Sequence, residues 1–123
     1  MSSFTDLARR YIDAWNETDP AARHKAVADL YSEDASYVDP MASATGHQEI
    51  AGVIGAVQGR FPGFCFRLAG PVDGHHDQAR FTWELGPEGQ AAPIAGFDAV
   101  VIDGDGRIRT VLGFLDKVPA AAA

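Results

Sequence analysis

The 123-residue sequence predicts a single α+β domain, because its hydrophobic pattern changes once, from the period of helices to that of strands. In the first half, apolar residues recur every three or four positions, as they do on one face of a helix. From residue 64 onward they alternate with polar residues, as in strands with one buried face. Helices that precede hairpin-linked strands, rather than alternating with them, indicate a largely antiparallel sheet.

Two helices are expected at the start of the chain. Residues 4–15 carry one continuous apolar stripe, and Ser3 followed by Asp6 fits a cap at the helix start. The polar residues 16–19 end this helix. Pro20 suits the first position of a second helix, whose apolar face is short.

A short strand and a third helix complete the first half. Residues 35–39 are of β-favouring types, and Pro40 closes the strand. A polar loop over residues 41–46 leads to the third helix. Its apolar residues from Ile50 to Val57 share one face.

The second half is predicted to form four strands linked mainly by hairpins. These are residues 64–68, 79–85, about 94–102 and 107–115. Asp73-Gly74 is interpreted as the turn between the first two strands, and the Asp-Gly-Asp-Gly run at 103–106 as the last hairpin turn. If this sheet is strongly curved with the helices across its concave side, an apolar pocket remains between the layers.

The composition excludes several function classes. Seventeen acidic against ten basic residues give a net charge of −7, which argues against nucleic acid or an anionic membrane as the main partner. No apolar run reaches the ~20 residues of a membrane span, and the N-terminus does not resemble a signal peptide. The single cysteine, Cys65, indicates a reducing compartment. We expect one cytoplasmic domain, residues 1–123, with an ordered core over about 4–117 and a frayed tail, 118–123.

Three polar residues lie where a purely structural pattern would place apolar ones. Tyr11 is on the apolar stripe of the first helix, and Asp39 ends an otherwise apolar strand on the side of Tyr37. Asp98 shares a strand face with Val100. Burying a carboxyl group is costly and raises its pKa, which suits such a group to acid–base chemistry near neutrality.

Each of these residues also has a structural interpretation. Tyr11 fits a core tyrosine whose hydroxyl reaches the rim, and Asp39 before Pro40 fits a turn. Asp98 fits a surface position at a β-bulge. The run 75–77, His-His-Asp, lacks spaced partners, so we expect no metal site there. The patterns alone leave these alternatives open.

Four stretches together resemble a known superfamily. They are Arg10 to Asn16, Leu30 to Pro40 with its terminal Asp-Pro, Gly46 to Ile50, and Phe97 to Ile108. With the element order, they resemble the nuclear-transport-factor-2-like superfamily, which includes ketosteroid isomerases and SnoaL-like polyketide cyclases. The resemblance covers about residues 4–117. It implies a cone-shaped, curved, mostly antiparallel sheet whose three N-terminal helices enclose an apolar pocket.

The resemblance also implies roles for single residues. Matched to the isomerases, Asp39 is the base that moves a proton next to a carbonyl, while Tyr11 and protonated Asp98 hold the enolate oxygen. Polyketide cyclases of this fold place their acid–base aspartate around the strand of Asp98. No metal or cofactor is implied. The side chains expected to bind the substrate are Trp15, Tyr31, Ile54, Phe66, Phe81, Trp83 and Phe114.

Other functions remain open at this point. A protein that only binds a small hydrophobic ligand would have the same pocket, and a cyclase would share the acid–base groups. An epoxide hydrolase of this fold would need an Arg-x-Asp pair, but Arg80 is followed at that spacing by Thr82. A purely structural dimerisation module is the last alternative. We expect a homodimer formed through the outer face of the sheet, because the strands carry apolar residues on both faces.

Overall fold

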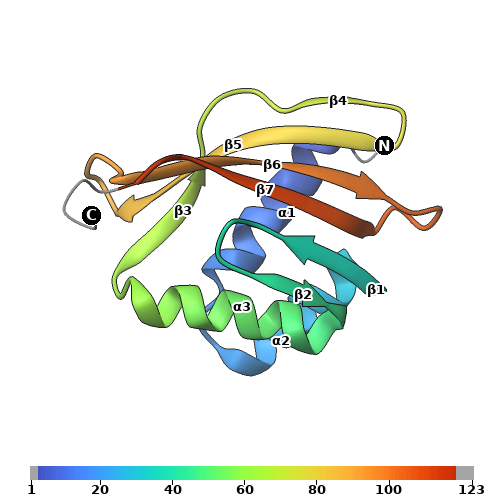
Figure 1. The fold of residues 1–123 in the computed structure, drawn as a ribbon, viewed down its shortest axis with the longest axis horizontal. Coiled ribbons are helices and arrows are strands. Elements are labelled where there is room, and N and C mark those ends of the chain that lie inside the picture. Colours follow the sequence, from blue (N-terminus) through green and yellow to red (C-terminus); the bar gives the residue numbers. More distant parts are fainter. Residues whose placement is uncertain (1–2, 119–123) are drawn as a thin grey trace.

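The computed structural model describes residues 3–118 and confirms the α+β class (Figure 1). The helices are α1 (Phe4–Asn16), α2 (Pro20–Leu30) and α3 (Gly46–Arg60). The strands are β1 (Tyr31–Val38), β2 (Ser43–Thr45), β3 (Phe64–Leu68), β4 (Asp73–His75), β5 (Gln78–Pro87), β6 (Ile94–Ile102) and β7 (Ile108–Lys117). Beyond Val118, the predicted tail lies outside the described residues.

The seven strands form one curved, open sheet in the order β2-β1-β7-β6-β5-β3, with β4 paired to β5. Every neighbouring pair is antiparallel except β1 and β7, which run parallel. The expected mostly antiparallel sheet is therefore confirmed. The register of β6 against β7 shifts at Ala95/Gly96 and again at Val101/Ile102. Such irregularities bend a strand pair and contribute to curvature.

The predicted helix starts are confirmed by their capping contacts. The Ser3 side chain accepts a hydrogen bond from the Asp6 backbone N–H at 3.1 Å. Asp19 accepts one from the N–H of Ala22 at 2.9 Å, and Pro20 occupies the first turn of α2. These side chains satisfy backbone donors that have no partner within a helix.

The turn predicted at Asp73-Gly74 is wrong. These residues form β4, and the chain reverses after His75, where His76 has a φ of 54°. Gly74 is needed for packing, since a Cβ atom there would lie 2.4 Å from the ring of Phe4. A glycine that signals a turn in the sequence thus marks a close approach between a strand and α1.

Two further boundaries differ from the prediction. β1 begins at Tyr31, directly after α2, rather than at residue 35, because Tyr31 already pairs with Ile108 of β7. The segment 41–46, predicted as a loop, contains β2, which pairs with β1. Pairing with a neighbour far along the chain makes these residues strands, and local propensity does not reveal it.

The helices lie together on one side of the long strands β5, β6 and β7 (Figure 1). The core between the two layers contains fully buried side chains from both, including Val27, Tyr31, Ile50, Val100 and Val111. No helix within residues 3–118 is long and apolar enough to cross a membrane.

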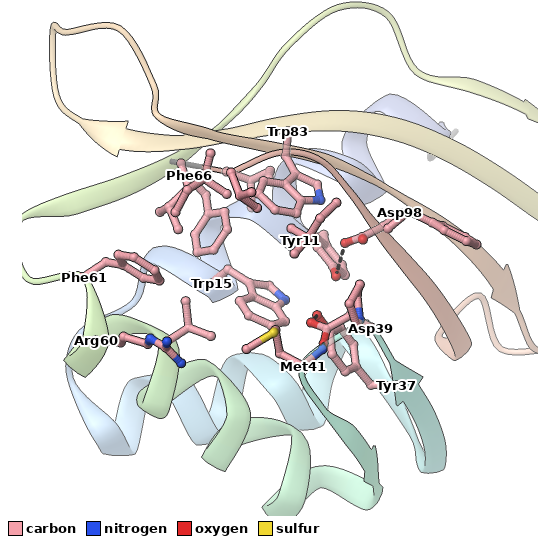
Figure 2. A pocket seen from close by; sticks show the side chains of 18 residues that line it. Tyr11, Trp15, Tyr37, Asp39, Met41, Arg60, Phe61, Phe66, Trp83 and Asp98 are labelled. Atoms are coloured by element: carbon pink, nitrogen blue, oxygen red, sulfur yellow. Dashed lines mark hydrogen bonds between the residues drawn. The ribbon is translucent and has the colours of Figure 1, made fainter. Parts of the chain in front are cut away.

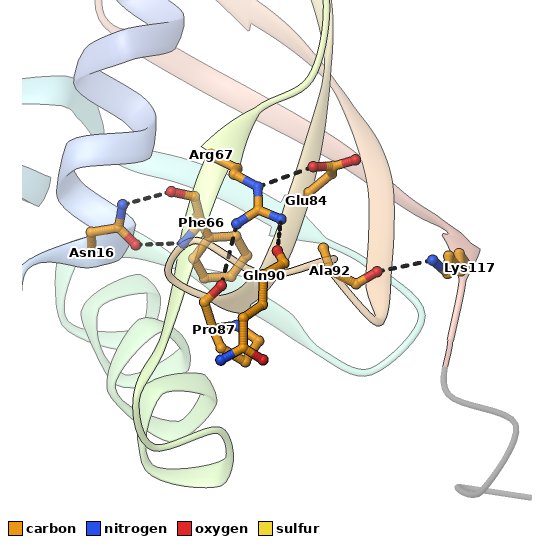
Figure 3. A network of polar contacts seen from close by, with 8 residues as sticks. All are labelled: Asn16, Phe66, Arg67, Glu84, Pro87, Gln90, Ala92 and Lys117. Carbon is orange, nitrogen blue, oxygen red and sulfur yellow. Dashed lines mark hydrogen bonds and ion pairs between the residues drawn. The ribbon is translucent and has the colours of Figure 1, made fainter.

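A network of polar contacts fixes β3 and the connection from β5 to β6 at one end of the sheet (Figure 3). Asn16 accepts a hydrogen bond from the Phe66 N–H at 2.7 Å and donates one to the Phe66 carbonyl at 2.9 Å. Arg67 pairs with Glu84 and donates to the Gln90 carbonyl at 2.7 Å. These contacts fix Phe66 relative to α1, which matters for the cavity that this side chain lines.

Candidate active site

A cavity of about 450 Å³ lies between the helical layer and the sheet (Figure 2). Its walls come from α1, the end of β1 and the residues that follow it, the end of α3, and strands β3, β5, β6 and β7. Most lining side chains are aromatic or aliphatic. The polar exceptions include Tyr11, Tyr37, Asp39 and Asp98, and Figure 2 shows these four on one side of the cavity.

Tyr11 and Asp98 form a buried hydrogen-bonded pair in the wall. The Tyr11 hydroxyl donates to Asp98 Oδ2 at 2.5 Å, and the two residues are only 2% and 3% exposed. Tyr11 belongs to the buried face of α1, and Asp98 lies on the face of β6 that also buries Gly96 and Val100. The alternative interpretation of Asp98 as a surface residue at a β-bulge is therefore wrong, and Asp98 points inward.

Burial gives this pair unusual titration behaviour. Several effects together raise the pKa of Asp98 to about 6, and the largest of them is desolvation by burial. The hydrogen bond from Tyr11 and the nearby indole of Trp83 lower this pKa, whereas the charge of Asp39 raises it. The Trp83 N–H affects this pKa by proximity, because it makes no hydrogen bond to any described residue. Burial, followed by the charge of Asp98, holds the pKa of Tyr11 well above its usual value. Near neutrality, Tyr11 is a neutral donor beside a carboxyl group able to gain or lose a proton.

Asp39 is half-buried and both of its oxygens are engaged. Oδ1 accepts hydrogen bonds from the N–H groups of Met41 and Ala42, each at 2.8 Å, and Oδ2 accepts one from the Tyr37 hydroxyl. The turn expected for Asp39-Pro40 is thus present, and Asp39 also lines the cavity. Burial, and next the charge of Asp98, raise the pKa of Tyr37, so its hydroxyl stays a donor.

Gly113 allows both carboxyl groups to occupy the same end of the cavity. It is the β7 partner of Asp98 in the sheet register. A Cβ atom at Gly113 would lie 2.9 Å from Asp98 Oδ1 and 3.0 Å from the Cβ of Asp39. The sequence analysis missed this residue, although an isolated glycine within a strand pattern is a signal for close approach.

The side chains expected to bind the substrate fall into two groups. Trp15, Phe66 and Trp83 line the cavity, and Phe114 also borders it, although its half-exposed ring stacks on that of Phe97 on the outer face of the sheet. The other three, Tyr31, Ile54 and Phe81, do not reach it and are at most 3% exposed. The ring of Tyr11 packs on that of Phe81, with centroids 5.0 Å apart, and it packs on Tyr31 at 6.2 Å. These three side chains therefore belong to the core. Sequence periodicity identifies a buried face, but it does not tell which of its side chains reach a cavity.

Several lining residues were not singled out by the sequence. Tyr37, Met41, Val57, Arg60 and Phe61 all contribute to the cavity. For Phe61 a signal exists, because it continues the spacing of Ile50, Ile54 and Val57 by one more turn of α3. For Arg60 there is none, since a charged residue at a helix C-terminus is ordinarily solvated.

The arrangement suits proton transfer on an apolar molecule. A carboxyl group with a pKa near neutrality and a neutral phenol line a pocket whose other walls are mostly apolar, and both lie close to a second carboxyl group, that of Asp39. Among residues 3–118, no three His, Cys, Asp or Glu side chains are grouped so as to hold a metal ion.

Comparison with known proteins agrees with the fold. The family model of the SnoaL-like domain matches residues 8–111. A SnoaL-like family protein of Agrobacterium tumefaciens strain C58, provisionally named an isomerase, is 40% identical over 91% of this chain and 96% of its own, with a TM-score of 0.87. No curated protein sequence matches the chain.

More distant structures share the fold alone. A provisionally named polyketide cyclase of Sinorhizobium meliloti is 19% identical over 92% of this chain and 99% of its own, with a TM-score of 0.70. An NTF2-like protein of unknown function from Cytophaga hutchinsonii is 16% identical over 94% and 92%, with a TM-score of 0.69. The match of the family model over most of the chain shows that this protein belongs to the SnoaL-like domain family of the nuclear-transport-factor-2-like superfamily.

Proposed function

We propose that this protein is a cofactor-independent enzyme that transfers a proton on a small hydrophobic carbonyl compound, as ketosteroid isomerases do. The observation that carries the proposal is Asp98, a carboxyl group whose pKa is raised to about 6 beside the buried Tyr11 hydroxyl. A group that titrates near the working pH can both accept and return a proton efficiently. The relative from Agrobacterium tumefaciens, provisionally named an isomerase, supports the same class.

The reaction begins with removal of a proton from the carbon next to the carbonyl group. The electron pair of the broken C–H bond moves into an enolate, and the Tyr11 hydroxyl, which donates to Asp98 in the resting state, can turn to the enolate oxygen once Asp98 has taken up the proton. The protonated carboxyl then returns the proton, either to the same carbon or to another carbon of the conjugated system. Isomerisation results in the second case.

The contacts of the two carboxyl groups favour Asp98 as the proton carrier. With a pKa of about 6, Asp98 is mostly ionised at neutral pH and accepts a hydrogen bond, so it is ready to take up a proton. Asp39 already accepts three hydrogen bonds, which hold both of its oxygens in place and leave it less free to reach a substrate carbon. This assignment exchanges the roles that the isomerase resemblance implies for Asp39 and Asp98.

A second candidate, a polyketide cyclase, is favoured by the same assignment of Asp98. Cyclases of this fold place their acid–base aspartate around this strand, and ring closure also starts with proton removal next to a carbonyl group. The enolate carbon then attacks a second carbonyl of the same molecule. The cavity of about 450 Å³ has room for a fused-ring compound.

Deuterium exchange next to a carbonyl group tests the proposal without knowledge of the natural substrate. Ketones such as β-tetralone and a β,γ-unsaturated steroid ketone are incubated in D₂O with the protein, and loss of the proton signal is followed by NMR. Wild type should accelerate exchange on at least one ketone, and Asp98→Asn should reduce this by about 10²-fold or more. Asp105→Asn removes an exposed carboxylate elsewhere and should have no effect.

The outcomes separate the alternatives. A larger loss of exchange rate for Asp39→Asn than for Asp98→Asn would restore the roles implied by the resemblance, with Asp39 as the base. If wild type binds these ketones but accelerates exchange on none of them, the enzyme proposal is wrong and a ligand-binding protein remains.

A further inference from the structure

Arg60 is the one positively charged residue among the side chains that line the cavity. It is the last residue of α3, and its side chain lies with Phe61 on the side opposite Asp98 (Figure 2). Aromatic side chains, including Trp15 and Phe66, lie between the two ends. The cavity is therefore polarised, with carboxyl groups at one end and a guanidinium group at the other.

The guanidinium group of Arg60 has no partner among residues 3–118, and it is exposed to solvent. It forms no hydrogen bond and no ion pair with any residue from 3 to 118, whereas Arg67, near the same end of the sheet, binds Glu84 and two backbone carbonyls. The helix dipole favours a cation at the C-terminus of α3, which explains why a basic residue stands at position 60. It does not explain why the Arg60 side chain lines the cavity. Its donors remain available to a group inside the cavity.

The remaining charges would oppose the entry of an anion. The chain carries a net charge of −7, and two of its acidic residues, Asp39 and Asp98, line the cavity itself. A negatively charged ligand would thus be repelled, unless its charge lay next to Arg60 and away from the carboxyl groups. A neutral acceptor would gain less from Arg60 than a carboxylate would, because hydrogen bonds between charged groups are stronger. The placement of this cation consequently selects both the charge and the orientation of a ligand.

We propose that the substrate carries a carboxylate at the end opposite its reactive carbonyl group, and that Arg60 binds this carboxylate. The inference rests on the proposed function for the identity of the reacting end, and it adds the substrate class. A planar guanidinium can hold a carboxylate through two parallel hydrogen bonds, which fixes orientation as well as charge. Bound in this way, the molecule would present its enolisable carbon to Asp98 and Tyr11.

Calorimetric titration with unreactive phenols tests the inference. The probes are hydroxybenzoate, hydroxynaphthoate and hydroxybiphenyl carboxylate, each with its hydroxyl and carboxylate at opposite ends, and the matching neutral carboxamides. The phenol mimics an enol beside Asp98, and the three lengths allow one probe to span the cavity. For that probe, wild type should bind the carboxylate more tightly than the carboxamide.

Variants of Arg60 assign this preference. Arg60→Gln should raise the carboxylate-to-amide ratio of dissociation constants by about 5- to 20-fold, a moderate loss of preference because Arg60 is solvent-exposed. Arg60→Lys should retain part of the preference. Arg109→Gln removes an exposed cation outside the cavity and should leave the ratio unchanged.

The inference is overturned if Arg60→Gln leaves the carboxylate-to-amide ratio unchanged for all three probe lengths. The circular dichroism and Tm of this variant must match those of wild type. Acceleration of deuterium exchange on neutral ketones would survive that result, and the proposed function with it. Conversely, an Arg60-dependent preference without exchange on neutral ketones and on ketones that carry a distal carboxylate would refute the enzyme but support the anionic ligand.

Discussion

At the residue scale, the site depends on a carboxyl group that the fold keeps out of water. Asp98 could be predicted because a polar residue on an apolar strand face is conspicuous, and the same holds for Tyr11 on its helix stripe. Arg60 and Gly113 could not, since their importance depends on which other residues come near them. For Gly113 this is the approach of two carboxyl groups from β6 and from the end of β1. Tertiary contacts of this kind do not produce a periodic pattern in the sequence.

The raised pKa of Asp98 predicts a specific pH dependence of stability. The folded-state pKa, about 6, lies above that of an exposed aspartate. The contribution of Asp98 to stability is therefore fully present below about pH 4 and lost as the pH rises through about 6. Between pH 4.5 and 7.5, wild type should lose about 1–3 kcal/mol of unfolding free energy relative to Asp98→Asn.

Urea unfolding of both proteins at several pH values measures this difference, and the comparison cancels the titration of all other groups. A constant difference between wild type and variant across the range would mean that Asp98 titrates like an exposed carboxyl group. The assignment of Asp98 as proton carrier would then lose its physical basis.

At the element scale, periodicity identified the three helices and the four long strands of the second half. It could not identify β2 or β4, which have three residues each and exist because a neighbouring strand pairs with them. It also could not place β3 relative to α1. Asn16 does this through side-chain bonds to the backbone of Phe66, fifty positions along the chain.

Replacing Asn16 should therefore affect both stability and the cavity. Asn16→Ala leaves the N–H and carbonyl of Phe66 without these partners, at a cost of about 1–3 kcal/mol in unfolding free energy. Ligand affinity should also fall, because the ring of Phe66 lines the cavity. Asn16→Asp keeps the acceptor and loses the donor. Its unfolding free energy, measured with urea, should lie between those of wild type and Asn16→Ala. Wild-type stability in Asn16→Ala would show that other contacts place β3 against α1.

At the scale of the whole molecule, the outer face of the sheet carries apolar side chains that the described chain leaves about half exposed. Leu112 and Phe114 on β7 are 46% and 50% exposed, and Val38 on β1 is 45% exposed. The Phe114 ring stacks on that of Phe97 from β6, with centroids 4.8 Å apart. An apolar patch shared by three neighbouring strands is typical of an interaction surface.

We expect this patch to form a homodimer interface. Light scattering after gel filtration should give twice the chain mass for wild type at micromolar concentration, and the monomer mass for Leu112→Glu, which places a charge in the patch. Arg109→Glu, an exposed change on the same strand outside the patch, is the control. A monomeric wild type would contradict the expectation.

The two tryptophans of the chain, Trp15 and Trp83, both lie in the wall of the cavity. Their emission, excited selectively at the red edge of the absorption band, therefore originates entirely from this one place. The Trp83 indole has no hydrogen-bond partner among the described residues, so its spectrum is sensitive to any polar group that enters. The fluorescence of these two tryptophans should therefore report whether a ligand occupies the cavity. A library of unlabelled compounds could be screened by quenching or by a spectral shift, before any reaction is known.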